Sequence, residues 1–282
     1  QGASVGALLR GFATHRNAFS PVAVIFNRIG SQRHKKILRE AAESAVPNMK
    51  ILGFVPKVDD LNLPERHLGL IQAIEHINLN NFLDVSASIV AEHIDIDELL
   101  KLAQPLKFAD VTQQTPIAPL GQKIAIAKDK AFSFQYQLVF DGWKRNGAEL
   151  SFFSPLDDQS PSEDTDAVYL SGGYPELYCR KLASCNNFMS GLRKAANRGS
   201  VIYGECGGYM VMGEGLVDAE GYRHAMAGLL PVETSFAQQK LHLGYREVRL
   251  SDHAANDSGG ILGGIGQRFR GHEFHYATII DQ

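Results

Sequence analysis

The first third of the chain alternates short apolar runs with amphipathic stretches. Residues 22–27 form a continuous apolar run, which is typical of a strand that is buried on both faces of a sheet. Ser31 can cap a helix that extends to about Ser44, and residues 50–55 predict a second buried strand. Strand, helix and strand in this order indicate a βαβ unit and hence a parallel sheet. Further helices are expected over 2–12, 68–78, 81–92 and 95–103.

A second alternating series begins at Lys123, after a polar stretch over 112–119 that contains two prolines. That stretch has no hydrophobic period, as is typical of an interdomain linker. We therefore expect two α/β domains, over residues 1–114 and 115–282. In the second, strands are expected at 123–128, 148–153, 166–171, 200–204, 241–250 and 268–277, and helices at 133–145, 176–198 and 207–213.

Composition and charge narrow the class of protein. Apolar residues make up 44% of the chain and charged residues 21%, as in an ordinary globular protein. A net charge of −3 and the absence of a long apolar run predict neither a nucleic-acid partner nor a membrane partner. Cys179, Cys185 and Cys206 show no Cys-x-x-Cys spacing. They predict a reducing cytoplasm, no disulfide framework and no metal site.

Residues 200–210 carry the sharpest chemical pattern. An apolar strand runs into Gly204, Glu205 and Cys206, and a helix is expected to begin directly behind the cysteine. Such an elbow holds a nucleophile exposed above the sheet, and the positive end of the helix favours a thiolate. We expect Cys206 to be a nucleophile rather than a buried structural cysteine beside a flexible turn.

Paired glycines follow the strand expected at 166–171. The backbone N–H groups of Gly172 and Gly173 can stabilise a developing oxyanion, with the N–H of Gly207, after the nucleophile, as a second donor. A Gly-Gly turn alone is a weak signal and is more often a simple loop. It gains force from the cysteine elbow in the same sheet.

Two histidines compete for the role of general base, because a cysteine nucleophile needs a nearby imidazole to take its proton. In a regular strand His272 and His275 lie on opposite faces, so only one of them can meet Cys206. A β-bulge between the two would exchange their faces. Glu273 shares a face with His275 and is a candidate to orient it.

Several motifs together resemble a known family. Gly-Glu-Cys-Gly-Gly-Tyr-Met at 204–210, Ser-Gly-Gly-Tyr-Pro-Glu at 171–176 and Gly-His-Glu-Phe-His-Tyr at 271–276 resemble the triad-type glutamine amidotransferase domain of the cobyrinic acid a,c-diamide synthase family. Residues 26–34 and 64–70 resemble its ATP-dependent synthetase domain, which is related to dethiobiotin synthetase. The resemblance implies a partial P-loop, dethiobiotin-synthetase-like parallel-sheet domain followed by an α/β amidotransferase domain.

The resemblance implies a carbon–nitrogen ligase of cobalamin synthesis. Such an enzyme amidates the a and c side-chain carboxylates of cobyrinic or hydrogenobyrinic acid, with glutamine as nitrogen donor and with ATP and Mg²⁺. It makes Cys206 the glutaminase nucleophile, His275 the histidine that activates it, and Gly172, Gly173 and Gly207 the residues that bind glutamine and its oxyanion. Ala277 stands where related amidotransferases place a glutamate.

The synthetase half departs from the family pattern. Gly-x-x-x-x-Gly-Lys-[Ser/Thr] occurs nowhere in the 282 residues, although its backbone N–H groups and lysine hold the ATP phosphates. We expect this loop upstream of Gln1 and a further C-terminal piece, so that the chain is a fragment. Asn27, Glu65, Arg66 and His67 remain as candidates to bind the nucleotide or the acidic substrate. The last three are alternatively a charged loop that caps a helix.

Two alternative functions stay open. A sibling amidase, either a cobyric acid synthase or a nickel-sirohydrochlorin a,c-diamide synthase, would use the same Cys–His pair on another macrocycle or carboxylate. A non-catalytic binding module is the other alternative, because the phosphate loop is absent from the chain. A homodimer is left open as well.

Overall fold

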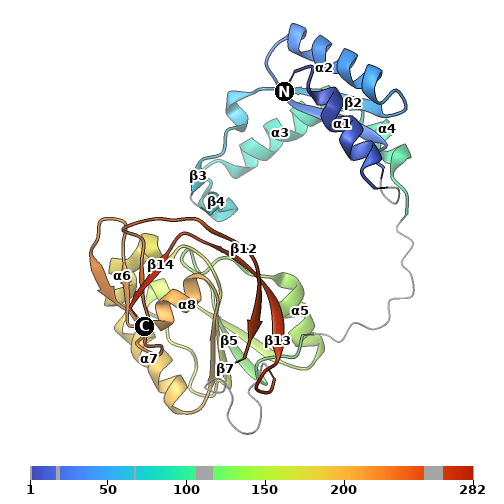
Figure 1. Ribbon diagram of the computed structural model, residues 1–282. Helices are drawn as coiled ribbons and strands as arrows, with labels where there is room; N and C mark the ends of the chain where they lie inside the picture. The colour runs from blue at the N-terminus through green and yellow to red at the C-terminus, as the bar shows by residue number, and fades with distance from the viewer. Residues whose placement is uncertain (1, 17–19, 67, 106–116, 251–262, 282) are drawn as a thin grey trace. The chain divides into compact units, whose positions relative to one another are not determined.

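A computed structural model describes residues 2–16, 20–66, 68–105, 117–250 and 263–281 (Figure 1). The chain divides into two compact units, Gln1–Val111 and Thr112–Gln282, and each is described by itself. The division falls within residues 106–116, which lie outside the described residues. The boundary between residues 114 and 115 therefore stays a prediction.

The first unit holds the expected βαβ arrangement. Its elements are α1 (Val5–Thr14), β1 (Ala23–Ile29), α2 (Gln32–Ala45) and β2 (Lys50–Pro56). β1 and β2 pair in parallel, which confirms the predicted sheet type. The hydroxyl of Ser31 accepts a hydrogen bond of 3.1 Å from the backbone N–H of His34 and so caps α2 as expected. Apolar side chains of α1, α2, β1 and β2, among them Val5, Leu9, Leu38 and Phe54, form the core of this unit.

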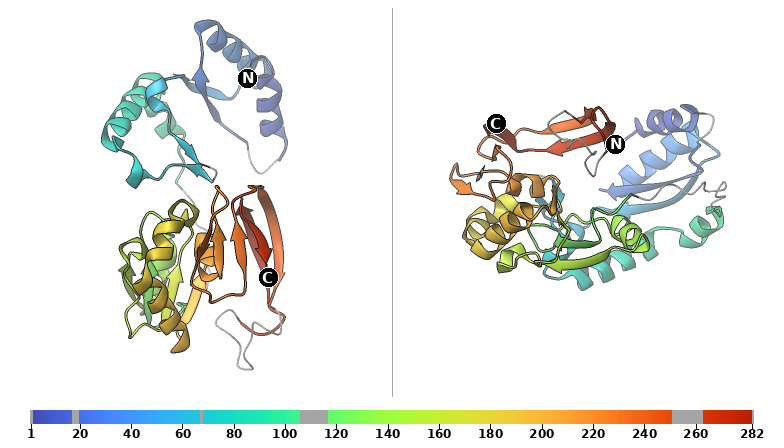
Figure 2. Two further views of the ribbon diagram at one scale, coloured as in Figure 1. Left: turned by 90° about the vertical axis from the view of Figure 1, so that its left-hand side faces the viewer. Right: turned by 90° about the horizontal axis from the view of Figure 1, so that it is seen from below.

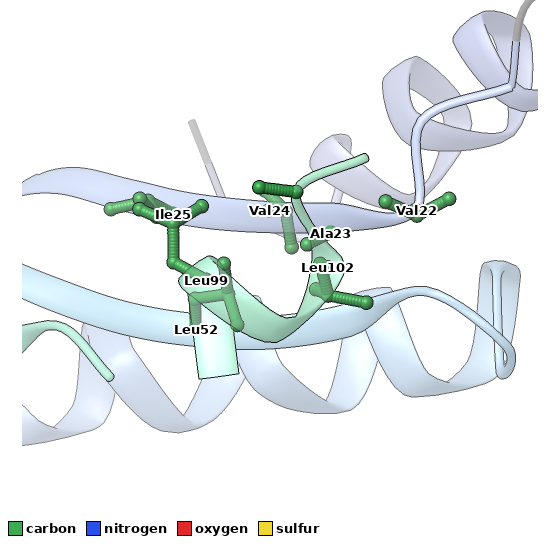
Figure 3. Close-up of a pocket in the computed structure, with 8 residues that line it drawn as sticks. Val22, Ala23, Val24, Ile25, Leu52, Leu99 and Leu102 are labelled. Carbon is green, nitrogen blue, oxygen red and sulfur yellow. The ribbon is translucent and has the colours of Figure 1, made fainter. Parts of the chain in front are cut away.

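The expectation that the first strand is buried on both faces is wrong. Val22, just before β1, is 59% exposed and Ile25 is 39% exposed. With Leu52, and with Leu99 of α4 (Ile96–Leu102), they line an open apolar pocket of about 330 Å³ (Figure 3). The apolar run predicts burial from the residue types alone and does not show how many elements cover the strand. Among the described residues, however, β1 pairs only with β2, and the short α4 covers the second face only in part.

Residues 68–78 do not form the expected helix. Instead β3 (Glu65–Arg66) and β4 (Gly69–Leu70) make an antiparallel hairpin, a 3₁₀ turn follows at Ala73–Glu75, and α3 (Leu79–His93) comes next. Gly69 has φ +135°, far from helical values. The guanidinium of Arg66 binds both carboxylate oxygens of Glu75, at 2.7 and 3.0 Å. This ion pair joins two residues nine positions apart and favours the compact turn. The spacing of apolar residues within the segment does not predict such a pair.

The second unit is built on a four-stranded parallel sheet in the order β6-β5-β7-β8. Its strands are β5 (Lys123–Ala127), β6 (Glu149–Phe153), β7 (Ala167–Leu170) and β8 (Val201–Gly204). Ile124 and Ile126 belong to the core that α5 (Gln137–Arg145) covers, whereas Ala125 and Ala127 belong to the core that α7 (Asn186–Asn197) covers (Figure 1). The alternation places one core on each face of the sheet. The expected α/β architecture with parallel sheets is confirmed.

The single helix expected over 176–198 is wrong. The segment contains a 3₁₀ turn (Pro175–Tyr178), α6 (Cys179–Ser184) and α7, with a break at Cys185. The carboxylate of Asp158 accepts hydrogen bonds from the backbone N–H of Phe188, at 2.9 Å, and from the side-chain amide of Asn187, at 3.0 Å. Asp158, which comes from an earlier loop, therefore binds a free N–H group at the start of α7 and stabilises a separate helix there. Cys179 and Cys185 are both buried and serve packing.

The two long strands expected near the end of the chain form an antiparallel ribbon, β12 (His242–Arg249) with β13 (Arg268–His275) (Figure 2). Their register is continuous over all eight pairs. Four strands that the apolar pattern does not predict form a mixed sheet, namely β9 (Gly215–Val217), β10 (Arg223–Ala225), β11 (Glu233–Ser235) and β14 (Thr278–Asp281). Three or four residues are too few to show a period of two. Within the described ranges, no helix has the length and apolar character needed to cross a membrane.

Candidate active site

Cys206 lies in a strained turn between the sheet and a short helix. β8 ends at Gly204, α8 (Gly207–Met212) begins one residue after the cysteine, and Cys206 itself has φ 49° and ψ −111°. A positive φ is unusual for a residue with a Cβ and marks stored backbone strain. A Cβ on Gly208 would lie 2.1 Å from the carbonyl oxygen of Leu170. The turn thus requires glycine behind the cysteine, and it leaves the Cys206 side chain exposed.

The thiol of Cys206 is surrounded by opposing electrostatic effects. Desolvation raises its pKa, and the charges of Glu176 and Glu205 act in the same direction, whereas the backbone N–H groups of Gly207 and Gly173 lower it by hydrogen bonding to the sulfur. The net pKa is raised above its usual value. The N–H of Gly207, at the start of α8, acts in the direction expected of the helix end, and desolvation outweighs it.

The predicted oxyanion donors converge on this thiol. A Cβ on Gly172 would lie 3.3 Å from the Cβ of Cys206, and a Cβ on Gly207 would lie 3.2 Å from the backbone nitrogen of Gly173. The loop after β7 is fixed in place because the carbonyl oxygen of Gly172 accepts a hydrogen bond of 2.9 Å from the N–H of Phe134. The structure thus brings Cys206, Gly172, Gly173 and Gly207 together at the carboxyl ends of β7 and β8.

Tyrosine side chains and Glu205 form a cluster beside Cys206 that the sequence pattern does not predict. The carboxylate of Glu205 accepts a hydrogen bond of 2.9 Å from the hydroxyl of Tyr169, whose ring stacks on Tyr203 at 5.7 Å. Desolvation raises the pKa of Glu205, and the Tyr169 hydrogen bond lowers it in part. The pKa of Tyr136 is also raised, mainly by desolvation and further by the nearby charges of Glu205 and Cys206. The only sequence signal was the position of Glu205 directly before the nucleophile.

The two competing histidines lie on opposite faces of β13. The ring of His272 packs near Tyr245 at 5.4 Å, whereas that of His275 stacks on His242 at 4.7 Å. No register shift occurs between β12 and β13, so the parity expected of a regular strand is confirmed. Glu273 shares the face of His275, and its Oε1 lies 2.9 Å from Nε2 of that ring.

The structure does not join His275 to Cys206 by a hydrogen bond. Nδ1 of His275 lies 2.8 Å from the carbonyl oxygen of Ala277, and Nε2 faces Glu273. Both partners are acceptors, so an imidazole that donates to both carries two protons. In this arrangement neither ring nitrogen is free to take the thiol proton.

Asn27 and Glu65, singled out from the sequence of the first unit, line one pocket. The pocket measures about 490 Å³, also contains Lys57 and Asp59, and lies beyond the carboxyl ends of β1 and β2, where parallel sheets commonly bind ligands. Oδ1 of Asn27 accepts a hydrogen bond of 2.8 Å from the N–H of Arg28, and Arg28 has a strained φ of 58°.

The other two candidates of the first unit are Arg66 and His67. Arg66 is held by Glu75, and their side chains are only 22% and 12% exposed, as in a structural ion pair. His67 lies outside the described residues. A role for Arg66 and His67 in binding nucleotide or substrate stays a prediction.

Comparison with known proteins supplies an independent finding. Residues 123–282 match the CobB/CobQ-like glutamine amidotransferase domain. The chain is 47% identical to the hydrogenobyrinate a,c-diamide synthase of Brucella anthropi over 281 residues, which is 99% of this chain and 62% of the relative. The enzymes of that name from Sinorhizobium sp and Rhodobacter capsulatus are 46% and 45% identical over 98% and 100% of this chain. The chain thus spans 62% of the length of these relatives.

Proposed function

Because the chain belongs to the CobB/CobQ-like glutamine amidotransferase family, we propose that it carries the glutamine-hydrolysing site of an ATP-dependent carbon–nitrogen ligase. The relatives named hydrogenobyrinate a,c-diamide synthase support a corrin-type macrocycle as the acceptor. Their name favours a,c-diamide formation on this macrocycle over the reactions of the sibling amidases, which use another macrocycle or another carboxylate. The observation that carries the proposal is the strained, exposed Cys206 with two backbone N–H groups directed at its sulfur.

The first half-reaction follows from this geometry. Sγ of Cys206 attacks the side-chain carbonyl carbon of glutamine, and the resulting oxyanion accepts hydrogen bonds from the N–H groups of Gly173 and Gly207. The C–N bond breaks, the nitrogen takes a proton and leaves as ammonia, and a glutamyl thioester remains. Water then hydrolyses the thioester to glutamate and restores the thiol.

In this proposal His275 takes the thiol proton and returns it to the leaving nitrogen. That role requires Nε2 to exchange Glu273 for the thiol, because the carboxylate occupies this nitrogen in the described arrangement. Glu273 acts as a positioning residue in place of the glutamate that Ala277 replaces. Its second oxygen is bound by Arg246 at 2.5 Å, so the carboxylate has its own support.

For the second half-reaction we propose that ammonia attacks a ring carboxylate that ATP has activated as an acyl phosphate. A free carboxylate would have to expel hydroxide, and phosphate is the better leaving group. The pocket of Asn27, Lys57 and Asp59 fits the base or ribose of a nucleotide by its polar lining. The 282 residues contain no phosphate-loop motif, so the groups that would hold the ATP phosphates and Mg²⁺ are not among them.

We further propose a cytoplasmic enzyme whose partners are glutamine and hydrogenobyrinic acid. Three free cysteines in the described residues support a reducing compartment. Homodimer formation stays a prediction.

The test is glutamine hydrolysis by the 282-residue chain, followed as ammonia and glutamate release. Cys206→Ala should abolish the release, whereas Cys185→Ala, which alters a buried cysteine away from the elbow, should retain it. Circular dichroism of both variants checks that each is folded. A wild-type chain that binds glutamine and releases no ammonia would favour the non-catalytic binding module instead.

A further inference from the structure

Three side chains with nitrogen and oxygen donors meet on one face of the β12–β13 ribbon. His242 and His275 are directly opposite each other in the antiparallel register, and Glu273 precedes His275 by two residues on the same face. One donor atom from each of the three lies within 4.8 Å of the other two. The imidazole rings are almost parallel, with 13° between their planes. The three residues come from two strands, so their spacing in the sequence does not predict the group.

The hydrogen bonds of His275 define which nitrogen is available. The carbonyl oxygen of Ala277, 2.8 Å from Nδ1, can only accept, so Nδ1 carries a proton. Nε2 lies 2.9 Å from Oε1 of Glu273, which is also an acceptor when ionised. Two lone pairs at this distance repel unless a cation lies between them. A second proton satisfies this requirement, and so does a metal ion.

The surroundings are those of metal ligands. A histidine ligand usually donates its second nitrogen to a carbonyl oxygen, and a carboxylate ligand is usually held by a partner of its own. Ala277 supplies the carbonyl oxygen, and Arg246 forms an ion pair of 2.5 Å with Oε2 of Glu273, without the geometry of a hydrogen bond. Nε2 of His242 is buried without a hydrogen-bond partner in the described structure. An unsatisfied nitrogen of this kind gains a partner when it binds an ion.

Two imidazoles and one carboxylate are the donor set of many zinc sites with an open fourth position. Ligand atoms around a tetrahedral Zn²⁺ lie roughly 3.3 Å apart. Side-chain movements of about 1 Å bring the three donors to that spacing from their present separation. His242 is half-buried, and the side chains of His275 and Glu273 are 40% and 26% exposed, so solvent reaches part of the group.

We propose that His242, Glu273 and His275 form a binding site for one divalent transition-metal ion of the Zn²⁺ class, and that its occupation prevents His275 from serving Cys206. The ion replaces the proton between Nε2 and Glu273, and a water molecule completes its coordination. The inhibitory part rests on the proposed function, whereas the binding part does not.

Metal binding is measured first, in the Cys206→Ala background, so that the exposed thiol cannot be a ligand. Co²⁺ serves as the spectroscopic probe and Zn²⁺ as its competitor. The expected result is a visible d–d band that saturates at one ion per chain and is lost when Zn²⁺ is added. His242→Ala and Glu273→Gln should each weaken binding by at least about 10-fold. His272→Ala, on the same strand but the opposite face, is the matched control and should leave the affinity unchanged.

Several outcomes would overturn the site. A dissociation constant above about 1 mM for both ions in folded protein would do so. If His272→Ala and His242→Ala weakened metal binding equally, the ion would be bound by scattered surface histidines. If Glu273→Gln left the affinity unchanged, the carboxylate would accept a proton from His275 and would not bind the metal.

Inhibition is measured separately, as glutamine hydrolysis by the chain with Cys206 intact. One equivalent of Zn²⁺ should suppress the rate, and a chelator should restore it. Each rate is normalised to the metal-free rate of the same variant, and His242→Ala should need at least about 10-fold more Zn²⁺ for half inhibition. Binding without inhibition would overturn the inhibitory part alone. A metal-free chain with no glutaminase activity would overturn the proposed function and leave the Co²⁺ result standing.

Discussion

The cysteine elbow and the histidine ribbon are built in opposite ways. Cys206 follows β8, whose sheet has cores on both faces, and the glycines around it allow almost no displacement, since a Cβ on Gly173 would lie 2.1 Å from Ala131. His275 lies on a two-stranded ribbon that exposes large side chains, with Tyr245 at 87% and Leu243 at 58%. A two-stranded ribbon by itself is marginally stable in water.

The difference separates two requirements of catalysis. The nucleophile and the oxyanion donors are positioned by the core, so they are ready without substrate. The base depends on a ribbon that holds it through Glu273 and Ala277. Substitutions at the elbow should therefore act on the oxyanion, and substitutions on the ribbon should act on proton transfer.

Among substitutions that leave the nucleophile in place, the largest effect is expected from His275→Ala. Loss of a general acid–base should slow glutamine hydrolysis roughly 100-fold or more. His272→Ala, on the opposite face of β13 beside Tyr245, should change the rate little and act through packing. Steady-state ammonia release from the two variants makes the comparison. The reverse ranking would remove His275 from the mechanism while leaving the Cys–His chemistry possible with His272.

A smaller effect is expected from Gly207→Ala. The added Cβ would lie 2.6 Å from Cδ of Pro175, so the backbone N–H must shift away from the oxyanion. Displacing a donor without removing it should lower kcat by roughly 10- to 100-fold. Gly142→Ala introduces the same methyl group into open space on α5 and is the control. Equal rates for both variants would show that the Gly207 N–H does not serve the reaction.

The smallest effect is expected from Tyr169→Phe, which removes the hydrogen bond to Glu205. Leaving this partly buried carboxylate without its donor should lower the free energy of unfolding by about 1–3 kcal/mol. Desolvation already raises the pKa of Glu205 and the Tyr169 hydrogen bond opposes it, so the variant raises that pKa further. A raised carboxyl pKa gives stability that is present below the unfolded-state pKa and is lost as pH rises through the folded-state value.

The deficit of Tyr169→Phe should therefore grow from pH 4.5 to pH 7.5 in urea unfolding. Tyr222→Phe, at a 66% exposed position, is the control and should change stability little at either pH. A deficit that shrinks as the pH rises would contradict the assignment of the ionised Glu205 as the acceptor.

The sequence predicted the elbow because all its parts are local. An apolar strand, glycines and a cysteine adjacent in the chain define the turn, and parity along one strand separated His272 from His275. The helix break at Cys185 was missed because it depends on Asp158, from a loop before β7. The raised pKa of Cys206 was missed because desolvation is a property of the assembled site. The same holds for the group of His242, Glu273 and His275, which cross-strand pairing creates.

The central claim is that Cys206 attacks the side-chain carbonyl of glutamine at the elbow. Its most direct test is mass spectrometry of the chain after incubation with an electrophilic glutamine analogue that alkylates a catalytic thiol. We expect one adduct, on Cys206, and protection of this residue by glutamine. An adduct on Cys179 or Cys185 instead, or labelling of Cys206 that glutamine does not slow, would contradict the account.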